Sequence, residues 1–217
     1  MKKAKTSSGT AELVAKFAEG LPAELMPQIA WQDKLVLYLD RLAAYNRSFN
    51  LVGPENIADI LASLVPDSFQ LAAMLARLPL PENPLALDCG AGAGLPGIPL
   101  RMIWQPGKYT MIEQRRKRAL FLENVLAELH LPGTGVFAGD AFKVAEPADL
   151  IISRAWMPVP KILDYCAARL ADGGFAIIFA RDAALPVHAD FENFLEIEYS
   201  SPTGKRKIRA ARRGRRI

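Results

Sequence analysis

Cysteine and histidine are scarce in this chain, with two of each among 217 residues. Cys89 and Cys166 alone cannot form the disulfide framework of a small secreted domain, so a reducing compartment is expected. His130 and His188 stand far apart in the sequence, and neither has the ligand spacing of a metal site. We therefore expect neither structural disulfides nor a bound metal.

Long apolar runs are also missing, because no stretch approaches the roughly 20 apolar residues that span a bilayer. The lysines near the N-terminus are not followed by the apolar segment of a secretion signal. A hydrophobic content of 51% with 23% charged residues is that of an ordinary globular protein. We expect a cytoplasmic protein without membrane attachment, and we expect a monomer.

Positive charge is concentrated at the two ends of the chain. Three lysines lie within the first five residues and eight Lys and Arg residues after position 204, which leaves 16 basic against 23 acidic residues between them. A basic tail on an acidic body indicates a polyanionic partner, most simply nucleic acid, although a solubilising end is the alternative. RNA contacts are predicted for Lys205, Arg206, Lys207, Arg209, Arg212 and Arg213.

What the chain does have is a glycine-rich turn after an apolar strand at 85–89. The turn contains Gly90, Gly92, Gly94 and Gly97. Glycine has no Cβ, so a ligand can lie against bare backbone, and such a turn before a helix is typical of nucleotide-binding α/β domains. The letters satisfy the G-x-G-x-x-G pattern of NAD-dependent oxidoreductases. Asp88, however, gives the D-x-G-x-G-x-G form of S-adenosylmethionine (SAM) methyltransferases.

Strand and helix patterns alternate after this turn, which predicts a mostly parallel sheet. The expected strands are 85–89, 109–113, 135–138, 149–153 and 174–180. The expected helices lie near 95–104, 115–130 and 158–171. A short helix after Pro186 and a hairpin of 195–200 with 205–211 should follow. Methyltransferases close a seven-stranded sheet with such a hairpin, whereas dehydrogenases seldom do.

The first part of the chain shows helical rather than strand patterns. Apolar residues recur at helical spacing from Leu35 to Phe49, and a second helix is expected over about 56–77, bent by Pro66. The expected organisation is a disordered N-terminus (1–10), a helical extension (11–80), a SAM-binding core (84–204) and a basic strand and tail (205–217). The fold class is α/β, a seven-stranded Rossmann-like SAM-dependent methyltransferase fold with an N-terminal helical extension.

Several segments resemble one family in the same order along residues 30–185. They are the glycine turn with Leu95-Pro96-Gly97-Ile98-Pro99-Leu100, Asn46 with Asn50-Leu51, Asp67-Ser68, Lys117-Arg118 with Phe121-Leu122, and Ile152-Ser153-Arg154-Ala155. The family is the bacterial small-subunit ribosomal RNA guanine-N7 methyltransferase, also called glucose-inhibited division protein B.

The resemblance implies SAM as cofactor and methyl transfer to N7 of a guanine in 16S ribosomal RNA, either as RNA or within the 30S subunit. Three departures affect the expected RNA side: Leu64 replaces a histidine, Pro66 interrupts the same turn, and Arg181-Asp182 follow the fifth strand. The alternatives are a SAM methyltransferase of a small molecule, an RNA-binding assembly factor with a vestigial SAM pocket, and an NAD-dependent oxidoreductase.

The predicted cofactor site lies at the carboxyl ends of the strands. Its residues are Asp88, Gly90, Gly92, Gly94, Leu95, Glu113, Asp140, Ala141, Phe142 and Arg154. Glu113 ends the second strand, where a carboxylate can accept hydrogen bonds from ribose hydroxyls. An ion pair of Glu113 with Arg115 or Arg116 is the alternative.

Two other predictions depend more on the resemblance. It implies that Asp140 and Phe142 contact the adenine, against the alternative of a loop aspartate beside a core phenylalanine. Leu95 is expected beside the cofactor, although a plain core position is the rival interpretation. The cations 115–118 at the start of a helix suit either RNA phosphate or a solvated face.

Arg154 is the predicted catalytic residue. It ends the fourth strand, where open α/β sheets place ligand groups, and a cation among apolar neighbours usually meets an anion. The resemblance places it at the cofactor and target pocket, whereas an ion pair with Asp149 or Glu113 is the alternative. Guanine N7 carries an unprotonated lone pair, so alignment of the reactants is enough and no general base is required.

Overall fold

The computed structural model describes residues 8–180 and 184–214. Its centre is a seven-stranded sheet of order β3-β2-β1-β4-β5-β7-β6, in which the pairs from β3 to β5 are parallel and β7 is antiparallel to both neighbours. The strands are β1 (Leu85–Cys89), β2 (Lys108–Glu113), β3 (Thr134–Ala138), β4 (Ala148–Ser153), β5 (Leu170–Ala180), β6 (Phe191–Ser201) and β7 (Gly204–Arg213). The five strands expected before the hairpin are confirmed, four of them within one residue and β5 with an earlier start, and so is the hairpin.

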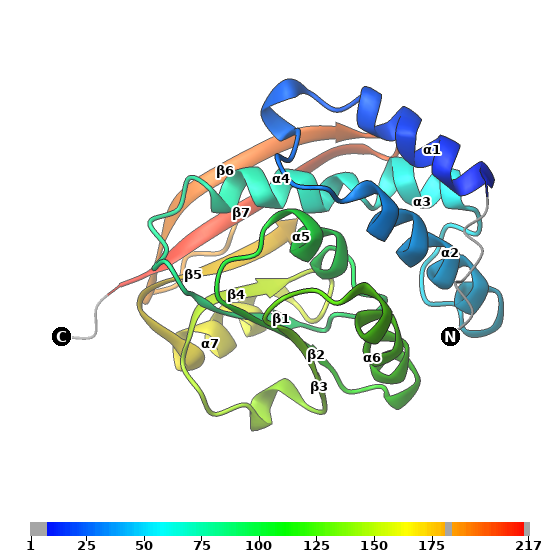
Figure 1. The fold of residues 1–217 in the computed structure, drawn as a ribbon. Helices are drawn as coiled ribbons and strands as arrows, with labels where there is room; N and C mark the ends of the chain where they lie inside the picture. The colour runs from blue at the N-terminus through cyan, green and yellow to red at the C-terminus, as the bar shows by residue number, and fades with distance from the viewer. Residues whose placement is uncertain (1–7, 181–183, 215–217) are drawn as a thin grey trace.

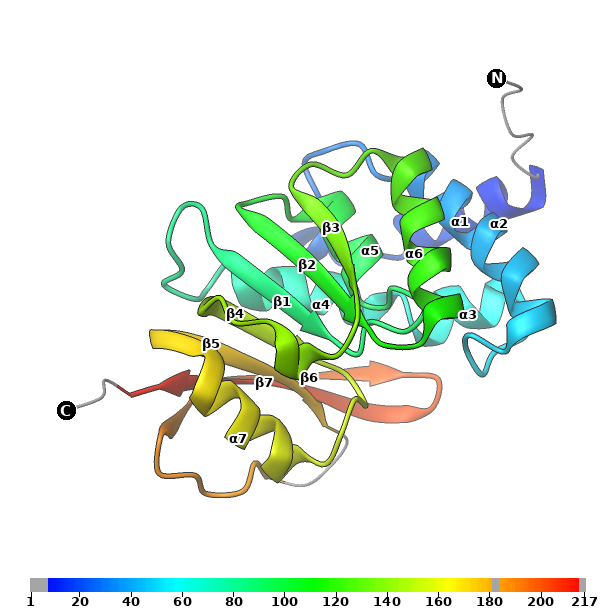
Figure 2. The ribbon, with the colours of Figure 1, turned by 90° about the horizontal axis from the view of Figure 1, so that it is seen from below.

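Helices cover both faces of this sheet. They are α1 (Ser8–Glu19), α2 (Gln32–Phe49), α3 (Ile57–Ser63), α4 (Pro66–Leu75), α5 (Gly97–Ile103), α6 (Arg116–Leu129) and α7 (Val159–Arg169), with short 3₁₀ turns η1 (Ala23–Leu25) and η2 (Ala141–Lys143). Helices α1 to α6 pack on one face of the sheet (Figure 1). Helix α7 packs on the other face and lies in front of the sheet in Figure 2.

The inner parallel strands β1 and β4 are largely apolar because both of their faces are buried, whereas the edge strand β3 is mostly exposed. In β4, Leu150 and Ile152 pack on the side of α1 to α6, while Ile151 packs against the α7 side. Side chains alternate between the faces with a period of two, so consecutive apolar residues serve both cores. The α/β class with a Rossmann-like sheet is therefore the observed fold.

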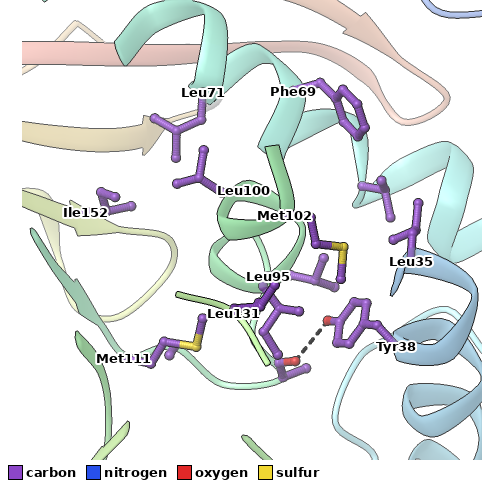
Figure 3. Close-up of a cluster of buried hydrophobic side chains, with 14 of the residues drawn as sticks. Leu35, Tyr38, Phe69, Leu71, Leu95, Leu100, Met102, Met111, Leu131 and Ile152 are labelled. Atoms are coloured by element: carbon purple, nitrogen blue, oxygen red, sulfur yellow. Dashed lines mark hydrogen bonds between the residues drawn. The ribbon is translucent and has the colours of Figure 1, made fainter. Parts of the chain in front are cut away.

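The N-terminal helices share one hydrophobic core with the sheet. Leu35 of α2 and Phe69 of α4 belong to the same buried cluster as Met111 of β2 and Ile152 of β4 (Figure 3). The Tyr38 hydroxyl, also buried, donates a hydrogen bond to the carbonyl oxygen of residue 93 at 2.9 Å, drawn as a dashed line in Figure 3. The helical layer therefore supports the glycine turn from behind.

The N-terminal part differs from the sequence prediction in two places. The disorder expected for residues 1–10 is wrong for Ser8–Thr10, which begin α1, while residues 1–7 lie outside the described residues. The Arg181-Asp182 pair also lies outside them. The helix expected over 56–77 is two helices, because Pro66 has no N–H to continue a helix and instead begins α4. By length and hydropathy alone Ile57–Leu75 could cross a membrane, but half of that stretch is buried in this core.

No helix follows Pro186 in the described part of the β5–β6 connection, 184–190, so that prediction is wrong. Strand β6 runs parallel to β5, because both are antiparallel to β7. The connection must therefore return along the length of the sheet. An extended chain covers about 3.3 Å per residue and a helix only about 1.5 Å, so a helix would use more residues for the same distance. Leu185 of this connection is buried against the α7 side.

The basic C-terminal segment is not a free tail up to residue 214. It forms β7, which lies between β5 and β6 inside the sheet. Arg209 and Arg213 are buried, with 6% and 5% of their surface exposed. Arg209 donates to Glu196 at 2.5 Å, and Arg213 contacts the carbonyl of Leu170. Both arginines are therefore corrected from RNA contacts to structural residues.

Other cations of β7 are also occupied by the protein. Lys205 and Lys207 form ion pairs with Glu198 of β6 at 2.6 and 3.3 Å, and Lys207 also pairs with Glu196 at 2.8 Å. Arg212 lies over the ring of Phe175 at 6.0 Å. Glu196 and Glu198 of β6 thus pair with three of the cations that the sequence places at the end of the chain.

Candidate active site at the carboxyl edge of the sheet

The glycine turn adopts backbone conformations that only glycine takes easily. Gly90, Gly92 and Gly94 have φ angles of +75°, +60° and +86°. A Cβ on Gly94 would lie 2.4 Å from Ile98 Cδ1. A Cβ on Gly92 would meet nothing closer than 3.7 Å. Gly94 therefore permits close helix packing, whereas Gly92 presents bare backbone to an open side.

A cavity of about 120 Å³ lies where four parallel strands end. It is lined by Gly90, Ile112, Glu113, Gln114, Arg115, Arg118, Gly139, Asp140, Ala141, Ala155 and Trp156. The carboxyl ends of parallel strands meet at one edge of a sheet, which explains why segments spread from 90 to 156 converge there. Of the predicted cofactor residues, Gly90, Glu113, Asp140 and Ala141 line this cavity. We call it the cofactor cavity.

Glu113 is 5% exposed, and its carboxylate is held by backbone N–H groups. Gly92 N–H donates to Oε2 at 2.9 Å, and Arg115 N–H donates to Oε1 at 2.8 Å. The bond to Arg115 comes from the main chain, so the alternative of a side-chain ion pair is not what the structure shows. Each carboxylate oxygen keeps a further lone pair and can still accept from a hydroxyl.

The loop after β3 forms another wall. The Asp140 side chain accepts a bond from the Phe142 N–H at 3.1 Å, and the Tyr165 hydroxyl donates to the Ala141 carbonyl at 3.1 Å. The Phe142 ring is 56% exposed and lies 6.1 Å from the ring of Trp156, which lines the cavity. Phe142 itself does not line the cavity, and its contact with an adenine stays a prediction.

Asp88 and Leu95 lie away from this cavity. The Asp88 carboxyl accepts a bond from the Tyr109 hydroxyl at 3.1 Å, and a Cβ on Gly97 would lie 2.3 Å from its Oδ2. Burial raises the pKa of Asp88 to about 7. Leu95 is buried in the core on the side of α1 to α6. Any effect of these two residues on a cofactor passes through the backbone of the turn.

Replacing Asp88 by asparagine should alter how stability depends on pH. Because the pKa rises from 3.8 unfolded to about 7 folded, the native state binds more protons between these values and its stability falls as pH rises from 4 to 7. From pH 5 to pH 8, Asp88→Asn should therefore gain stability relative to wild type, by roughly 2–3 kcal/mol. Urea denaturation at several pH values measures this. Asp33→Asn, an exposed carboxyl of α2, is the control, and a parallel pH profile for wild type and Asp88→Asn would contradict the prediction.

Arg154 pairs with neither of the two carboxylates expected from the sequence. Its Nε lies 3.0 Å from Oδ2 of Asp67, which has only 2% of its side chain exposed. Asp149 instead accepts the Leu85 N–H. Asp67 belongs to the Asp67-Ser68 segment of α4, which the sequence indicated only as part of the family resemblance. Its carboxylate is the partner of Arg154.

A second cavity of about 230 Å³ lies beside Arg154. It is lined by Asp67, Arg154, Ala155, Phe179, Tyr199, Arg206 and Lys207. Ala155 lines both cavities and has a φ of +56°, a conformation that costs energy for a residue other than glycine. We call this second space the Arg154 cavity; the segment 154–156 separates it from the cofactor cavity.

Two residues that brace the site were not predicted to contact the glycine turn. Tyr38 of α2 binds the carbonyl of Ala93, and the Ser68 hydroxyl of α4 donates to the carbonyl of Pro96 at 2.9 Å. Only the packing of the helical layer brings them to the glycine turn. Within 8–180 and 184–214, no three His, Cys, Asp or Glu side chains gather as a metal site.

Comparisons with known proteins agree on one family. The family described as rRNA small subunit methyltransferase G matches residues 31–185. A protein named ribosomal RNA small subunit methyltransferase G from Nitratidesulfovibrio vulgaris is 49% identical over 183 residues, covering 83% of each chain. One of the same name from Lawsonia intracellularis is 38% identical, covering 78% of this chain and 80% of its own.

Solved structures share the fold at low sequence identity. Magnesium protoporphyrin IX methyltransferase from Synechocystis, with bound SAM, has a TM-score of 0.59 and 16% identity, covering 86% of this chain and 100% of its own. The O-methyltransferase from Bacillus cereus has a TM-score of 0.59 and 15% identity, covering 81% and 90%. Likeness at this identity concerns the fold alone.

Proposed function

The chain belongs to the rRNA small subunit methyltransferase G family, and from this we propose that its cofactor cavity binds SAM for methyl transfer to N7 of a guanine in 16S ribosomal RNA. As a member of that family, the protein is a SAM-dependent methyltransferase. The observation that carries the proposal is the meeting of the glycine turn, Glu113 and the Asp140 loop in one cavity bordered by residue 155.

The residues of the cofactor cavity fit the chemistry of SAM. Ribose hydroxyls and the adenine amine are donors, and the carboxylates of Glu113 and Asp140 are acceptors. The methionine part ends in a carboxylate, for which the guanidinium groups of Arg115 and Arg118 offer paired donors. The sequence suggested RNA phosphate or a solvated face for both arginines, and for Arg115 an ion pair with Glu113; it did not suggest the cofactor, because their position beside the cavity depends on the fold.

The work of the protein in this reaction is alignment. When bound, SAM supplies an electrophilic methyl group on a sulfonium sulfur. Guanine N7 needs no proton removed, so the residues around Arg154 have to orient the base and exclude water. Alignment of this kind can recover roughly 7–11 kcal/mol of barrier.

We further propose a cytoplasmic protein that meets RNA through exposed cations. Lys205 keeps 72% of its side chain exposed despite its pairing, and Arg116 and Lys117 are exposed at the start of α6 beside the cofactor cavity. Arg206 and Lys207 of β7 reach solvent through the Arg154 cavity. These groups replace the free tail as the proposed RNA surface.

Transfer of a tritiated methyl group from SAM tests the function. Unmodified small-subunit RNA and intact 30S subunits are the acceptors, and the labelled nucleoside should be 7-methylguanosine. Arg154→Ala should lower the rate by about 1000-fold, because an orienting group is lost. Arg77→Ala, at an exposed arginine after α4, is the control. Label on another atom, or on small molecules only, would overturn the proposal.

A further inference from the structure

The Arg154 cavity is placed to hold the methyl acceptor. It shares the lining residue Ala155 with the cofactor cavity, so the two cavities are neighbours. Phe179 and Tyr199 give it apolar walls, and Arg154 and Arg206 give it donors. A volume of about 230 Å³ with two aromatic residues suits a planar heterocycle.

Hydrogen bonding within the cavity leaves one guanidinium partly free. Arg154 uses its Nε for Asp67, and its two terminal nitrogens have no protein partner in the part of the chain that the structure describes. About a quarter of the Arg154 side chain is exposed, and Arg154 lines the cavity. The free groups are all donors, so the ligand edge that they meet must present acceptors.

Asp67 is fully engaged and cannot itself meet a ligand. Its Oδ1 accepts from the Tyr199 hydroxyl at 2.6 Å and from Arg206 Nη1 at 2.9 Å. Its Oδ2 accepts from the same Arg206 nitrogen at 3.1 Å and forms the ion pair with Arg154 Nε at 3.0 Å. Burial raises the pKa of Tyr199, which keeps the hydroxyl protonated as a donor. Arg206 is further held by the carbonyl of Ser63 at 2.6 Å. One buried carboxylate of α4 therefore fixes Arg154, directly after β4, together with Tyr199 of β6 and Arg206 of β7.

Of adenine and guanine, only guanine presents acceptors at both O6 and N7, whereas adenine carries an amino donor at position 6. We propose that the Arg154 cavity receives the target guanine, that the terminal nitrogens of Arg154 donate to O6, and that Asp67 is a positioning residue that orients Arg154. With O6 held in this way, N7 stays free. The proposal rests on the proposed function and adds the residues that select the base.

The charges of the cavity agree with this reaction. The N7 lone pair forms the new N–CH₃ bond, the electron pair of the S–CH₃ bond returns to sulfur, and no proton moves. The purine thereby gains the positive charge that leaves the sulfonium. A cationic product beside Arg154, Arg206 and Lys207 would be repelled. The buried Asp67 carboxylate, which pairs with both arginines, and the glutamates of β6 that pair with Lys207 reduce that repulsion.

The test changes the exocyclic groups of the acceptor base. Once the methylated position is known, ligated transcripts carry guanosine, inosine or 2,6-diaminopurine there and guanosine elsewhere. Inosine keeps O6 and should retain kcat/KM within about fivefold. Diaminopurine has an amino donor in place of O6 and should lose about 100-fold or more, because it opposes the donors of Arg154. Equal transfer to diaminopurine would overturn the proposal while leaving the proposed function intact; no transfer to guanosine would overturn both.

Variants test the role of Asp67. Asp67→Asn should lower kcat/KM by about 30-fold and bring the ratio of guanosine to diaminopurine rates close to one, with calorimetric SAM affinity unchanged. Tyr199→Phe removes one donor to Asp67 and should shift the ratio in the same direction. Tyr45→Phe, whose hydroxyl meets Asn124 at 3.4 Å on the surface, is the matched control. A slower Asp67→Asn enzyme with an unchanged base ratio would overturn the positioning role, and the wild-type acceptor series decides the base assignment even if Asp67→Asn does not fold.

Discussion

Gly92→Val is expected to lower the affinity for SAM by about 100-fold or more. Gly92 has a φ of +60°, which a β-branched residue adopts only at a cost of several kcal/mol. Relaxing that strain moves the Gly92 N–H away from Glu113, whose carboxylate it binds at 2.9 Å. The change thus reaches the acceptor proposed for the ribose as well as the turn itself. Isothermal titration with SAM measures the loss.

Gly135→Val provides a matched control for this prediction. Gly135 lies in β3, has no positive φ, and a Cβ there would meet nothing within 4 Å. Valine favours strands, so this variant should fold and bind SAM as the wild type does. If Gly92→Val bound SAM as tightly as Gly135→Val, the glycine turn would not be part of the cofactor site.

Arg101→Met is expected to destabilise the folded protein strongly. Arg101 has no exposed surface, and its guanidinium closes the amino edge of the sheet. It donates to Thr134 Oγ1 and to the carbonyls of Trp104, Gln105, Pro106, Gly107 and Pro132 at 2.7 to 3.5 Å. Burial lowers its pKa to about 10, so it remains charged at neutral pH. Methionine fills similar space but leaves these buried carbonyls without a donor.

The cost of that loss is about 3–5 kcal/mol, as for other broken buried charge networks. For a chain of this size the midpoint of thermal unfolding should fall by about 10 °C. Arg77→Met, at an exposed arginine, should change the midpoint by less than about 2 °C. A loss of under 1 kcal/mol for Arg101→Met in denaturant titrations would show that water replaces the guanidinium at these carbonyls.

The sequence located the cofactor cavity because its parts follow local rules. Parallel strands buried on both faces appear as apolar runs, and a strand such as β4 is recognisable from Leu150, Ile151 and Ile152 alone. Once the strand ends are known, their carboxyl edge is known. Gly90, Glu113 and the residues after β3 could therefore be placed together before any contact was seen.

The tail and the pairing of Arg154 could not be predicted in this way. A run of cations after position 204 has the same composition whether it is a solvated tail or a strand beside Glu196 and Glu198. Asp67 and Arg154 are far apart in the chain, and either could have paired with a nearer charge. Which charged side chains form ion pairs depends on which elements pack together, and this cannot be read from the spacing of residues in the sequence.

The amino-acid sequence by itself determined the α/β class, the glycine turn and the family, because backbone conformation and apolar periodicity are set by neighbouring residues. Only the tertiary structure decided which charged side chains pair within the protein and which face a cavity. Arg209 and Arg213 became structural, and Arg154 was turned toward a cavity by Asp67. The physical reason is that a charge takes the partner that folding brings within a few ångströms, however distant that partner is along the chain.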